Sequence, residues 1–220
     1  MIPIGDDNPA RLTPVVTWFI VLACIATFLW QSSLGQEGGE AAIYAFGFTP
    51  RVFFNRSSSG PWLTVFTSMF MHGGLLHLGG NMLYLWIFGN NVEDAMGHLR
   101  FVAFYLAAGV AAIFVQAFAE PDAAVPMVGA SGAISGVLAA YVLIYPRARI
   151  RVIIPLGFLL YPTKISAIYV VGFWFILQLF SALTAQPGMA GTAWWAHIGG
   201  FAAGIALTPL LSDFPLFGRR

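Results

Sequence analysis

One stretch decides the fold: residues Ile165–Ser212, ISAIYVVGFWFILQLFSALTAQPGMAGTAWWAHIGGFAAGIALTPLLS, contain no Asp, Glu, Lys or Arg. A helix needs about 20 mostly apolar residues to cross a bilayer, so this stretch has room for two helices. Residues 186–191, QPGMAG, lie near its middle and contain the Pro-Gly pair that is typical of turns. The sequence therefore predicts two membrane-spanning helices, one on each side of these residues.

The remainder of the chain has the same apolar character. Of its 220 residues, 59% are hydrophobic and 9% are charged, whereas soluble domains carry about 25% charged residues. Such a chain has too little polar surface for water, so we expect the bilayer to be its solvent. We predict an all-α polytopic membrane protein, in which residues 1–220 form one domain with six transmembrane helices. The other four spans are expected near Pro14–Trp30, Pro61–Val92, Phe101–Ala119 and Ala123–Pro146.

The segments outside these spans fall into three groups. Residues 1–13 form an N-terminal segment that precedes the first span. Residues 35–61 include the aromatic run IYAFGFTPRVFFN, which is too short and too interrupted to span, so we predict an interfacial first loop there. The run VIIPLGFLLYP at 152–162 is also short and contains two prolines, and it too is expected at the interface.

The basic residues predict an orientation. With six spans both termini lie on one side of the membrane, and most of the basic residues fall on that side, which by the positive-inside rule is the cytoplasm. A chain of this size without an evident targeting segment fits a bacterial inner membrane. Its net charge of +1 argues against nucleic-acid binding, which needs a clustered basic face. The basic residues on the side of the termini are Arg11, Arg100, Arg147, Arg149, Arg151, Lys164, Arg219 and Arg220, and those on the other side are Arg51 and Arg56.

Polar side chains inside a bilayer are costly and are commonly functional. Ser131 lies in the sequence Gly129-Ala-Ser-Gly132 at the predicted entrance of the fourth helix. Free backbone N–H groups at a helix entrance can stabilise an oxyanion, so Ser131 is a candidate nucleophile. The alternative is that a serine among glycines only permits close helix packing. Ser135, one turn deeper, is a competing nucleophile that lacks the position at the helix entrance.

His197 lies near the start of the predicted sixth helix, on the same side of the membrane as Ser131. Gly200 and Gly204 share its helical face, which allows close contact with the fourth helix. We therefore expect His197 to act as a general base for Ser131, although a buried packing histidine or an interfacial anchor is the alternative. Because no Asp or Glu occurs inside the predicted spans, the sequence favours a serine–histidine dyad over a triad with a carboxylate.

Two donors in the predicted second helix complete the candidate site. His77 and Asn81 are four residues apart and share a helical face, so both can donate hydrogen bonds to an oxyanion. His72 lies about 140° around the helix from His77. We expect an outward-opening polar cavity, lined by His72, His77, Asn81 and His197, to supply water. A metal site is disfavoured because the chain has no His-Glu-x-x-His motif and only one cysteine, and no cofactor is predicted.

Three motifs together carry a family resemblance. FTSMFMHGGLLHLGGNMLYLWIFGNNVEDAMG, GASGAISG and AHIGGFAAG occur in this order and resemble the rhomboid intramembrane serine proteases over about Pro61–Leu211. The resemblance implies Ser131 as nucleophile, His197 as base, an oxyanion pocket of His77, Asn81 and the Ser131 amide, and a supporting His72. It also implies cofactor-free cleavage of single-pass or polytopic membrane protein substrates at or near the membrane segment. Substrates would enter past the second and fifth helices, with small residues before the cut.

Two positions depart from the family pattern. Family members often have an aromatic residue four positions after the nucleophile, packed under the histidine, and here that position is Ser135. The residue before the helix-two asparagine is often bulky, and here it is Gly80. Neither departure removes a reacting group, so we expect activity. The alternatives are a catalytically inactive rhomboid-like protein that binds membrane clients, and a small-solute transporter.

Overall fold

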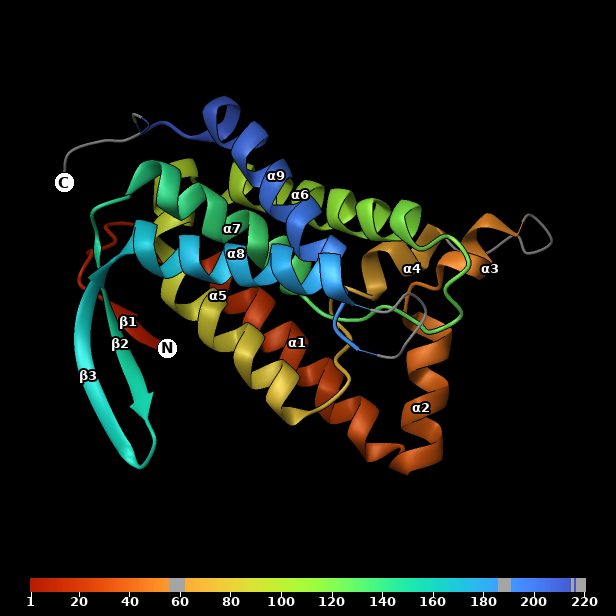
Figure 1. The fold of residues 1–220 in the computed structure, drawn as a ribbon. Helices are drawn as coiled ribbons and strands as arrows, with labels where there is room; N and C mark the ends of the chain where they lie inside the picture. The colour runs from red at the N-terminus through yellow and green to blue at the C-terminus, as the bar shows by residue number, and fades with distance from the viewer. Residues whose placement is uncertain (56–61, 186–190, 215, 217–220) are drawn as a thin grey trace.

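A computed structural model describes residues 1–55, 62–185, 191–214 and 216 of this chain. The long helices form a bundle, and Figure 1 shows a small sheet across one end of it and shorter helices at the other. Residues 186–190, which make up all but the last residue of the predicted break, lie outside the described residues, as do Arg56, Arg219 and Arg220. The elements are β1 (Ile2–Asp6), α1 (Val15–Ser33), α2 (Gly35–Phe46), α3 (Pro50–Phe54), α4 (Trp62–Thr67), α5 (Leu75–Met96), α6 (His98–Ala119), α7 (Ser131–Ile144), β2 (Arg149–Leu156), β3 (Leu159–Ser166), α8 (Ala167–Thr184) and α9 (Trp194–Leu211).

The predicted all-α polytopic membrane fold is confirmed. Among the described residues, the helices α1, α6, α8 and α9 are long and apolar enough to cross a membrane. Helix α5 has 22 residues but ends in a polar stretch, and α7 is apolar but has only 14 residues. At 1.5 Å per residue, α7 is about 21 Å long, which is shorter than the ~30 Å hydrocarbon core. It contacts α5, α6, α8 and α9, so these helices enclose it.

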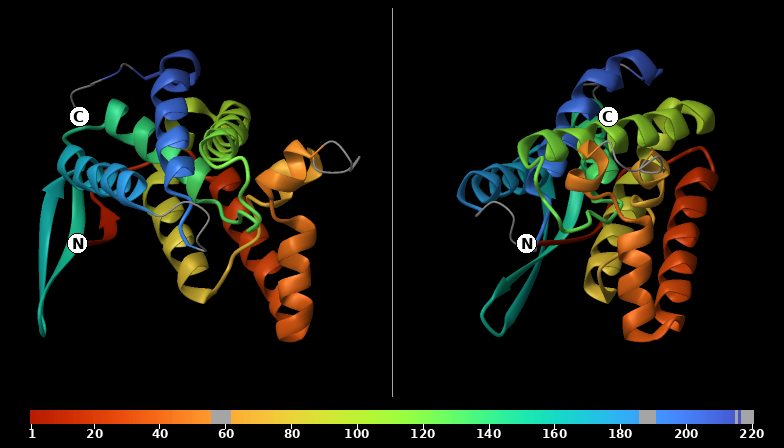
Figure 2. Two further views of the ribbon diagram at one scale, coloured as in Figure 1. Left: turned by 45° about the vertical axis from the view of Figure 1, so that its right-hand side comes forward. Right: turned by 90° about the vertical axis from the view of Figure 1, so that its right-hand side faces the viewer.

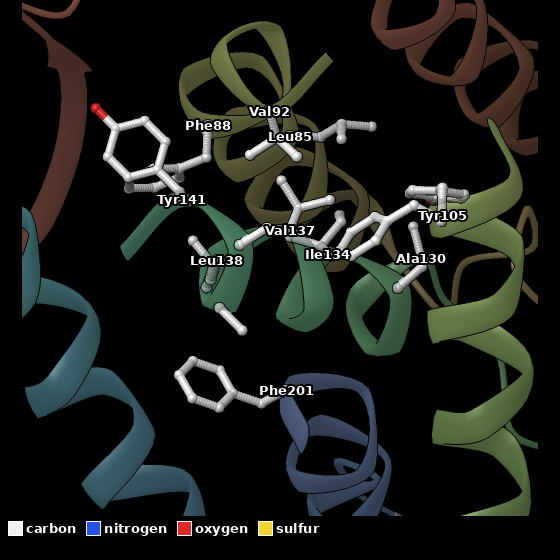
Figure 3. Close-up of a cluster of buried hydrophobic side chains, with 14 of the residues drawn as sticks. Leu85, Phe88, Val92, Tyr105, Ala130, Ile134, Val137, Leu138, Tyr141 and Phe201 are labelled. Carbon is white, nitrogen blue, oxygen red and sulfur yellow. The ribbon is translucent and has the colours of Figure 1, made fainter. Parts of the chain in front are cut away.

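The core of the protein is built around α7. Nearly all of its residues are buried, and Figure 3 shows its side chains meeting those of α5, α6 and α9. On the side towards α9 the contact is made by glycines, as their spacing predicts. A Cβ atom at Gly200 would overlap the carbonyl oxygen of Gly132, and one at Gly204 would overlap that of Gly136. The two backbones can therefore touch only because both helices lack side chains at these positions.

The second predicted span begins later than the sequence suggested. Residues 62–67 form the short helix α4, residues 68–74 form a non-helical connection, and α5 begins only at Leu75. The prediction that His72 lies on the same helix as His77 is therefore wrong. Helix α5 also continues past Val92, which brings Glu93 into the bundle.

Glu93 is a buried carboxylate that lies just beyond the predicted second span, in the polar end of α5. Its side chain is fully buried and accepts hydrogen bonds from the backbone N–H groups of Val16 and Thr17, at 2.9 and 2.8 Å, and from the Thr17 hydroxyl at 2.7 Å. A carboxylate is stabilised at a helix N-terminus by the free N–H groups and the helix dipole. Glu93 therefore holds the start of α1 against the end of α5, at the opposite end of α5 from His77.

A three-stranded antiparallel sheet, in the order β1-β2-β3, lies across the bundle end that carries β1 and the end of α9 (Figures 1 and 2). We call this end the termini end, and the opposite end, where α5, α7 and α9 begin, the loop end. Residues 152–162, which were expected at the interface, lie in the strands β2 and β3 and the turn between them, and the sequence pattern did not predict strands there. The hairpin of β2 and β3 is paired from Arg149↔Ser166 to Leu156↔Leu159.

The N-terminal strand β1 is held by its acidic end. Asp6 accepts a hydrogen bond of 2.6 Å from the Tyr141 hydroxyl on α7, and Asp7 pairs with Lys164 at 2.7 Å. Burial raises the pKa of Asp6 above its usual value, against the opposing effects of the Tyr141 hydrogen bond and the Arg151 charge. The Lys164 hydrogen bond lowers the pKa of Asp7. The pKa values of these two neighbouring carboxyls are thus shifted in opposite directions.

Candidate active site

The structure brings Ser131 and His197 into direct contact. Ser131 is the first residue of α7, and His197 lies in the first turn of α9. The His197 Nε2 atom is 2.8 Å from the Ser131 Oγ atom. His197 is 7% exposed, and Ser131 is partly exposed. The two helices start at the same end of the bundle, and the glycine contacts between them bring these two side chains within hydrogen-bond distance.

The other ring nitrogen of His197 is bound by a residue that the sequence analysis did not name. Its Nδ1 atom lies 2.6 Å from the Oε1 atom of Gln178 on α8. The Gln178 Nε2 group donates to the carbonyl oxygen of Trp174 at 3.3 Å, so Oε1 is left as the acceptor. His197 Nδ1 therefore carries the proton of the neutral ring, and its Nε2 lone pair faces the Ser131 hydroxyl. This is the tautomer that a general base for Ser131 requires.

Tryptophan side chains enclose the imidazole. The ring of Trp174 lies 5.9 Å from that of His197 at an angle of 36°, and the ring of Trp194 lies 6.0 Å away, edge-on. At the position where the family often has an aromatic residue, the fully buried Ser135 donates a 2.7 Å hydrogen bond to the Ser131 carbonyl oxygen. Its hydroxyl is thus used inside α7. Trp174 and Gln178, both from α8, orient the imidazole in place of the missing aromatic.

Two potential hydrogen-bond donors, from His77 and Asn81, lie close to Gly129, two residues before Ser131. A Cβ atom at Gly129 would lie 2.8 Å from the His77 Nε2 atom and 3.6 Å from the Asn81 Nδ2 atom. His77 Nδ1 accepts a 3.4 Å hydrogen bond from the Gly73 N–H, so in the neutral ring Nε2 is the nitrogen that carries hydrogen. The Asn81 Nδ2 group is buried and has no hydrogen-bond partner among the described residues. Both donors are thus available beside Ser131.

The conformation of Gly129 makes this convergence possible. Its φ angle is +126°, which residues with side chains rarely adopt. Its N–H donates to the Ser68 carbonyl oxygen at 2.9 Å, and the preceding Met127 pairs with Phe48 through two backbone hydrogen bonds of 3.0 and 2.7 Å. These bonds hold the chain extended before α7. They explain why the helix begins at Ser131 rather than near Ala123, where the fourth span was expected to begin.

His72 lies behind the site. It is fully buried, its Nδ1 atom is 3.2 Å from the Phe70 carbonyl oxygen, and its ring lies edge-on to His77 with 5.2 Å between the centroids. The Gln31 amide donates to the His72 carbonyl oxygen at 2.9 Å. His72 is not among the described residues that line the large cavity at the site. The expectation that it lines that cavity is therefore wrong, and it packs against the back of His77 instead.

A cavity of about 1010 Å³ opens above Ser131. Its walls come from the start of α5 and from the segments 123–128 and 191–194, with Trp174 contributed by α8, and α7 forms part of its floor. Gly80 lies on the α5 wall, where an added Cβ would meet no described atom within 4 Å. The cavity reaches from the loop end to Tyr84 and Leu138, which lie two turns inside the bundle. Its other lining residues include His77, Asn81, Gln116, Trp174 and His197.

A second glutamine was also missed. Gln116 on α6 is buried, and its Oε1 atom accepts a 3.2 Å hydrogen bond from the backbone N–H of Ala196, the residue before His197. Gln116 thereby fixes the start of α9. The signal for Gln116 and Gln178 was present in the sequence, because each is a polar residue inside an apolar span. No group of three or more His, Cys, Asp or Glu side chains within the described parts of the chain could hold a metal ion.

Comparison with known families assigns the chain. A family model described as "Rhomboid domain" matches residues 59–214, which is more than half of the sequence. The chain belongs to the rhomboid family. This rhomboid is 32% identical over 164 residues to "Rhomboid-like protein 11, chloroplastic" of Arabidopsis thaliana, with 70% of this chain and 54% of that protein covered. It is 31% identical over 210 residues to "Rhomboid protease GluP" of Bacillus subtilis (strain 168), with 94% and 37% covered.

A shorter match lies in the mitochondrial members of the family. This rhomboid is 40% identical over 88 residues to "Presenilin-associated rhomboid-like protein, mitochondrial" of Mus musculus, with 39% of this chain and 23% of that protein covered. The chain thus spans about half or less of the length of the curated relatives described here. Together with its apolar helices, these matches make it an integral membrane protein of a family that includes a protease.

Proposed function

We propose that this rhomboid is an intramembrane serine endopeptidase that uses a Ser131–His197 dyad. The observation that carries the proposal is the hydrogen-bonded series from Gln178 Oε1 to His197 Nδ1, and from His197 Nε2 to Ser131 Oγ, at 2.6 and 2.8 Å. A nucleophile beside a base that a third group orients is the arrangement that activates a serine. The series opens into a cavity large enough for an extended peptide segment.

In the proposed reaction, Ser131 Oγ attacks the carbonyl carbon of the scissile peptide bond while His197 Nε2 accepts the hydroxyl proton. The negative charge on the tetrahedral intermediate is stabilised by donors from His77 Nε2, Asn81 Nδ2 and the Ser131 backbone N–H. The intermediate collapses when His197 returns the proton to the leaving amine. Water entering through the cavity then hydrolyses the ester on Ser131, with His197 again accepting and returning the proton.

The position of the cavity suggests the substrate. It is lined by the start of α5 and by Trp174 of α8, and we propose that a membrane-anchored polypeptide enters between these two helices and reaches Ser131 without leaving the bilayer. The substrates proposed are single-pass or polytopic membrane proteins, cut in or near a transmembrane segment. An attacked carbonyl must be released from its helix, so residues that weaken the substrate helix should favour cleavage. Gly80 leaves the α5 wall open, which favours access for larger side chains.

The proposal includes the location of the protein. We place it in the bacterial inner membrane, with the termini end in the cytoplasm and the loop end outside. The basic residues Arg149, Arg151 and Lys164 at the termini end support this orientation through the positive-inside rule. Residues 1–220 are proposed to act as a single domain.

The experiment is cleavage of a model transmembrane substrate by the purified protein in lipid. The Ser131→Ala and His197→Ala variants are expected to abolish cleavage while retaining the helical fold and, for Ser131→Ala, substrate binding. A fluorophosphonate probe should label the unchanged protein and not Ser131→Ala. If the unchanged protein binds the substrate but neither cleaves it nor reacts with the probe, the chain is a client-binding rhomboid and the proposal is wrong.

A further inference from the structure

The hairpin of β2 and β3 has two chemically different faces. Side chains alternate along a strand, and residues paired across antiparallel strands share a face. We define the inner face as the one that carries Ile150 and the outer face as the one that carries Arg149. From the strand register, the inner face holds Ile150, Val152, Ile154, Leu156, Leu159, Tyr161, Thr163 and Ile165, and the outer face holds Arg149, Arg151, Ile153, Pro155, Leu160, Pro162, Lys164 and Ser166.

The inner face is continuous with the protein core along half its length. Ile150 and Val152 are fully buried in the main hydrophobic cluster. Further towards the tip, Leu156, Leu159 and Tyr161 are 57%, 55% and 53% exposed. Except at Thr163, the inner face thus stays apolar from its base, where the helices cover it, to its tip, where these side chains are exposed. An exposed apolar surface of this kind marks a site of contact with another apolar phase.

The outer face faces away from the bundle and is charged near its base. Lys164 and Arg151 lie 2.7 and 3.6 Å from the Asp7 carboxylate. Strand β1 pairs only with the base of β2, from Ile2↔Ile153 to Asp6↔Ile150, so it does not cover the tip. The hairpin therefore carries charge only at the base of its outer face, whose distal residues Ile153, Pro155, Leu160 and Pro162 are apolar. Its inner face carries a stripe that is apolar except at Thr163.

The direction of the hairpin identifies what the stripe meets. In Figures 1 and 2, β2 and β3 run across the direction of α8 and extend sideways beyond the bundle. Because α8 is a membrane span, a ribbon that crosses its direction at the termini end runs along the membrane surface. The inner face points towards the helices, so beyond the bundle it points towards the lipid that surrounds them.

We propose that the distal half of the hairpin lies on the bilayer at the termini end, with Leu156, Leu159 and Tyr161 inserted into the boundary between headgroups and acyl chains. The occupant of the apolar stripe is lipid rather than another protein. Tyrosine is favoured at this depth because its ring is apolar and its hydroxyl reaches water. Two strands leave backbone groups unpaired at their edges, so the ribbon stays at the interface and does not enter the hydrocarbon core.

Extension of this sheet by a second copy of the chain is disfavoured. Pro155 lies opposite Leu160, Pro162 lies opposite Ile153, and both prolines lack the backbone N–H that a further strand would need. Contact with lipid would also position α8, because the hairpin joins α7 to α8 and leads directly into Ala167, the first residue of α8. The anchored ribbon holds the start of α8 at a fixed level in the membrane, whatever reaction the loop end performs.

The test uses two neighbouring positions on opposite faces. Leu159 and Leu160 are 55% and 61% exposed, so neither position is needed for the core. The full chain, with the buried Cys24 replaced by Ala, carries Leu159→Cys or Leu160→Cys labelled with an environment-sensitive NBD fluorophore. Each variant is placed singly in phosphatidylcholine nanodiscs, whose two faces are both open to solution, with or without lipids that carry a doxyl quencher on the acyl chain.

At position 159 we expect a blue-shifted emission and quenching by the doxyl lipid that is roughly threefold or more greater than at position 160. At position 160 we expect quenching by dissolved iodide instead. If both positions respond equally to the lipid quencher, the assignment of faces is wrong. If both are open to iodide, the hairpin does not touch lipid and the proposal fails, which leaves the stripe available to a second copy or another protein. None of these readouts depends on proteolysis.

Discussion

His197 Nδ1 and Gln178 Oε1 are 2.6 Å apart, and this contact joins α9 to α8. Gln178 also donates to the Trp174 carbonyl oxygen, which fixes the direction of its amide. The imidazole that faces Ser131 is thus oriented by the helix that contributes Trp174 to the lining of the cavity. A displacement of α8 that widens the cavity would also release the imidazole, so access to the site and orientation of the base are mechanically linked.

The first prediction concerns this amide. Gln178→Leu removes the acceptor but keeps a similar volume, so we expect kcat to fall roughly 10- to 100-fold as the imidazole loses its orientation. KM should change little, because Gln178 is not among the described residues that line the cavity. Gln178→Glu, which retains an acceptor oxygen, should keep more activity than the leucine variant. Steady-state cleavage of a transmembrane substrate measures both constants, and a leucine variant with full kcat would refute a positioning role.

A second prediction concerns the unpartnered donor of Asn81. Asn81→Ala should lower kcat by ~10²-fold, the usual effect of removing one oxyanion donor. The fold should persist, since Asn81 Nδ2 makes no hydrogen bond to the described part of the protein. The control is Asn90→Ala, on the same helix but far along it from His77, which should keep near-normal kcat. Equal losses in the two variants would assign Asn81 to helix stability instead.

Gly129 provides a third prediction. Gly129→Ala should reduce both activity and thermal stability, because φ is +126° and the added methyl would lie 2.8 Å from the His77 ring. Gly79→Ala is the control, since an added Cβ there meets no described atom within 4 Å and a helical glycine is about 1 kcal/mol less favourable than alanine. Thermal unfolding in detergent and cleavage assays should separate the two variants. A tolerated Gly129→Ala would mean that the donors do not converge at this residue.

The acidic residues of the N-terminal strand predict opposite pH dependences. Burial raises the pKa of Asp6, so its contribution to holding β1 is largest in acid and is lost as pH rises through the raised pKa. The pKa of Asp7 is lowered by Lys164, so its contribution is present near neutral pH and is lost as pH falls through the lowered pKa.

Hydrogen exchange of the β1 amides between pH 3 and 7 measures this difference. Asp6→Asn should weaken the destabilisation of β1 as pH rises, whereas Asp7→Asn should weaken its destabilisation in acid. Tyr141 and Lys164, the partners of these carboxyls, are unchanged in both variants, so each variant reports on one carboxyl alone. Identical pH profiles for the two variants would contradict the opposite electrostatic environments.

The sequence predicted the membrane class and the meeting of Ser131 and His197 because both follow from one-dimensional patterns. Long charge-free runs mark spans, and small residues at Gly132, Gly200 and Gly204 mark where two helices can touch. These signals do not depend on the details of tertiary structure. The same patterns placed Ser131 near the start of a helix, but they began that helix at Ala123, whereas the residues between Ala123 and Ser131 are not helical.

Other features depend on contacts that no pattern displays. The connection at 68–74 is as apolar as a helix, so hydropathy did not separate His72 from α5. Residues 149–166 combine apolar runs with prolines, and their strand character follows from the pairing of β2 with β3 and of β1 with the base of β2. Gln178 was overlooked because a glutamine in a span gains meaning only when its partner, here an imidazole on another helix, is known.

The shortness of α7 has a consequence for where a substrate would be cut. Neighbouring helices enclose this 14-residue helix, so it cannot slide towards either surface, and its first residue carries the hydroxyl. Its length acts as a ruler: one turn inserted between Ser131 and the rest of α7 would move the hydroxyl about 5.4 Å along the helix axis. The bond that is cleaved would then be chosen by its height in the bilayer as much as by the side chains that flank it.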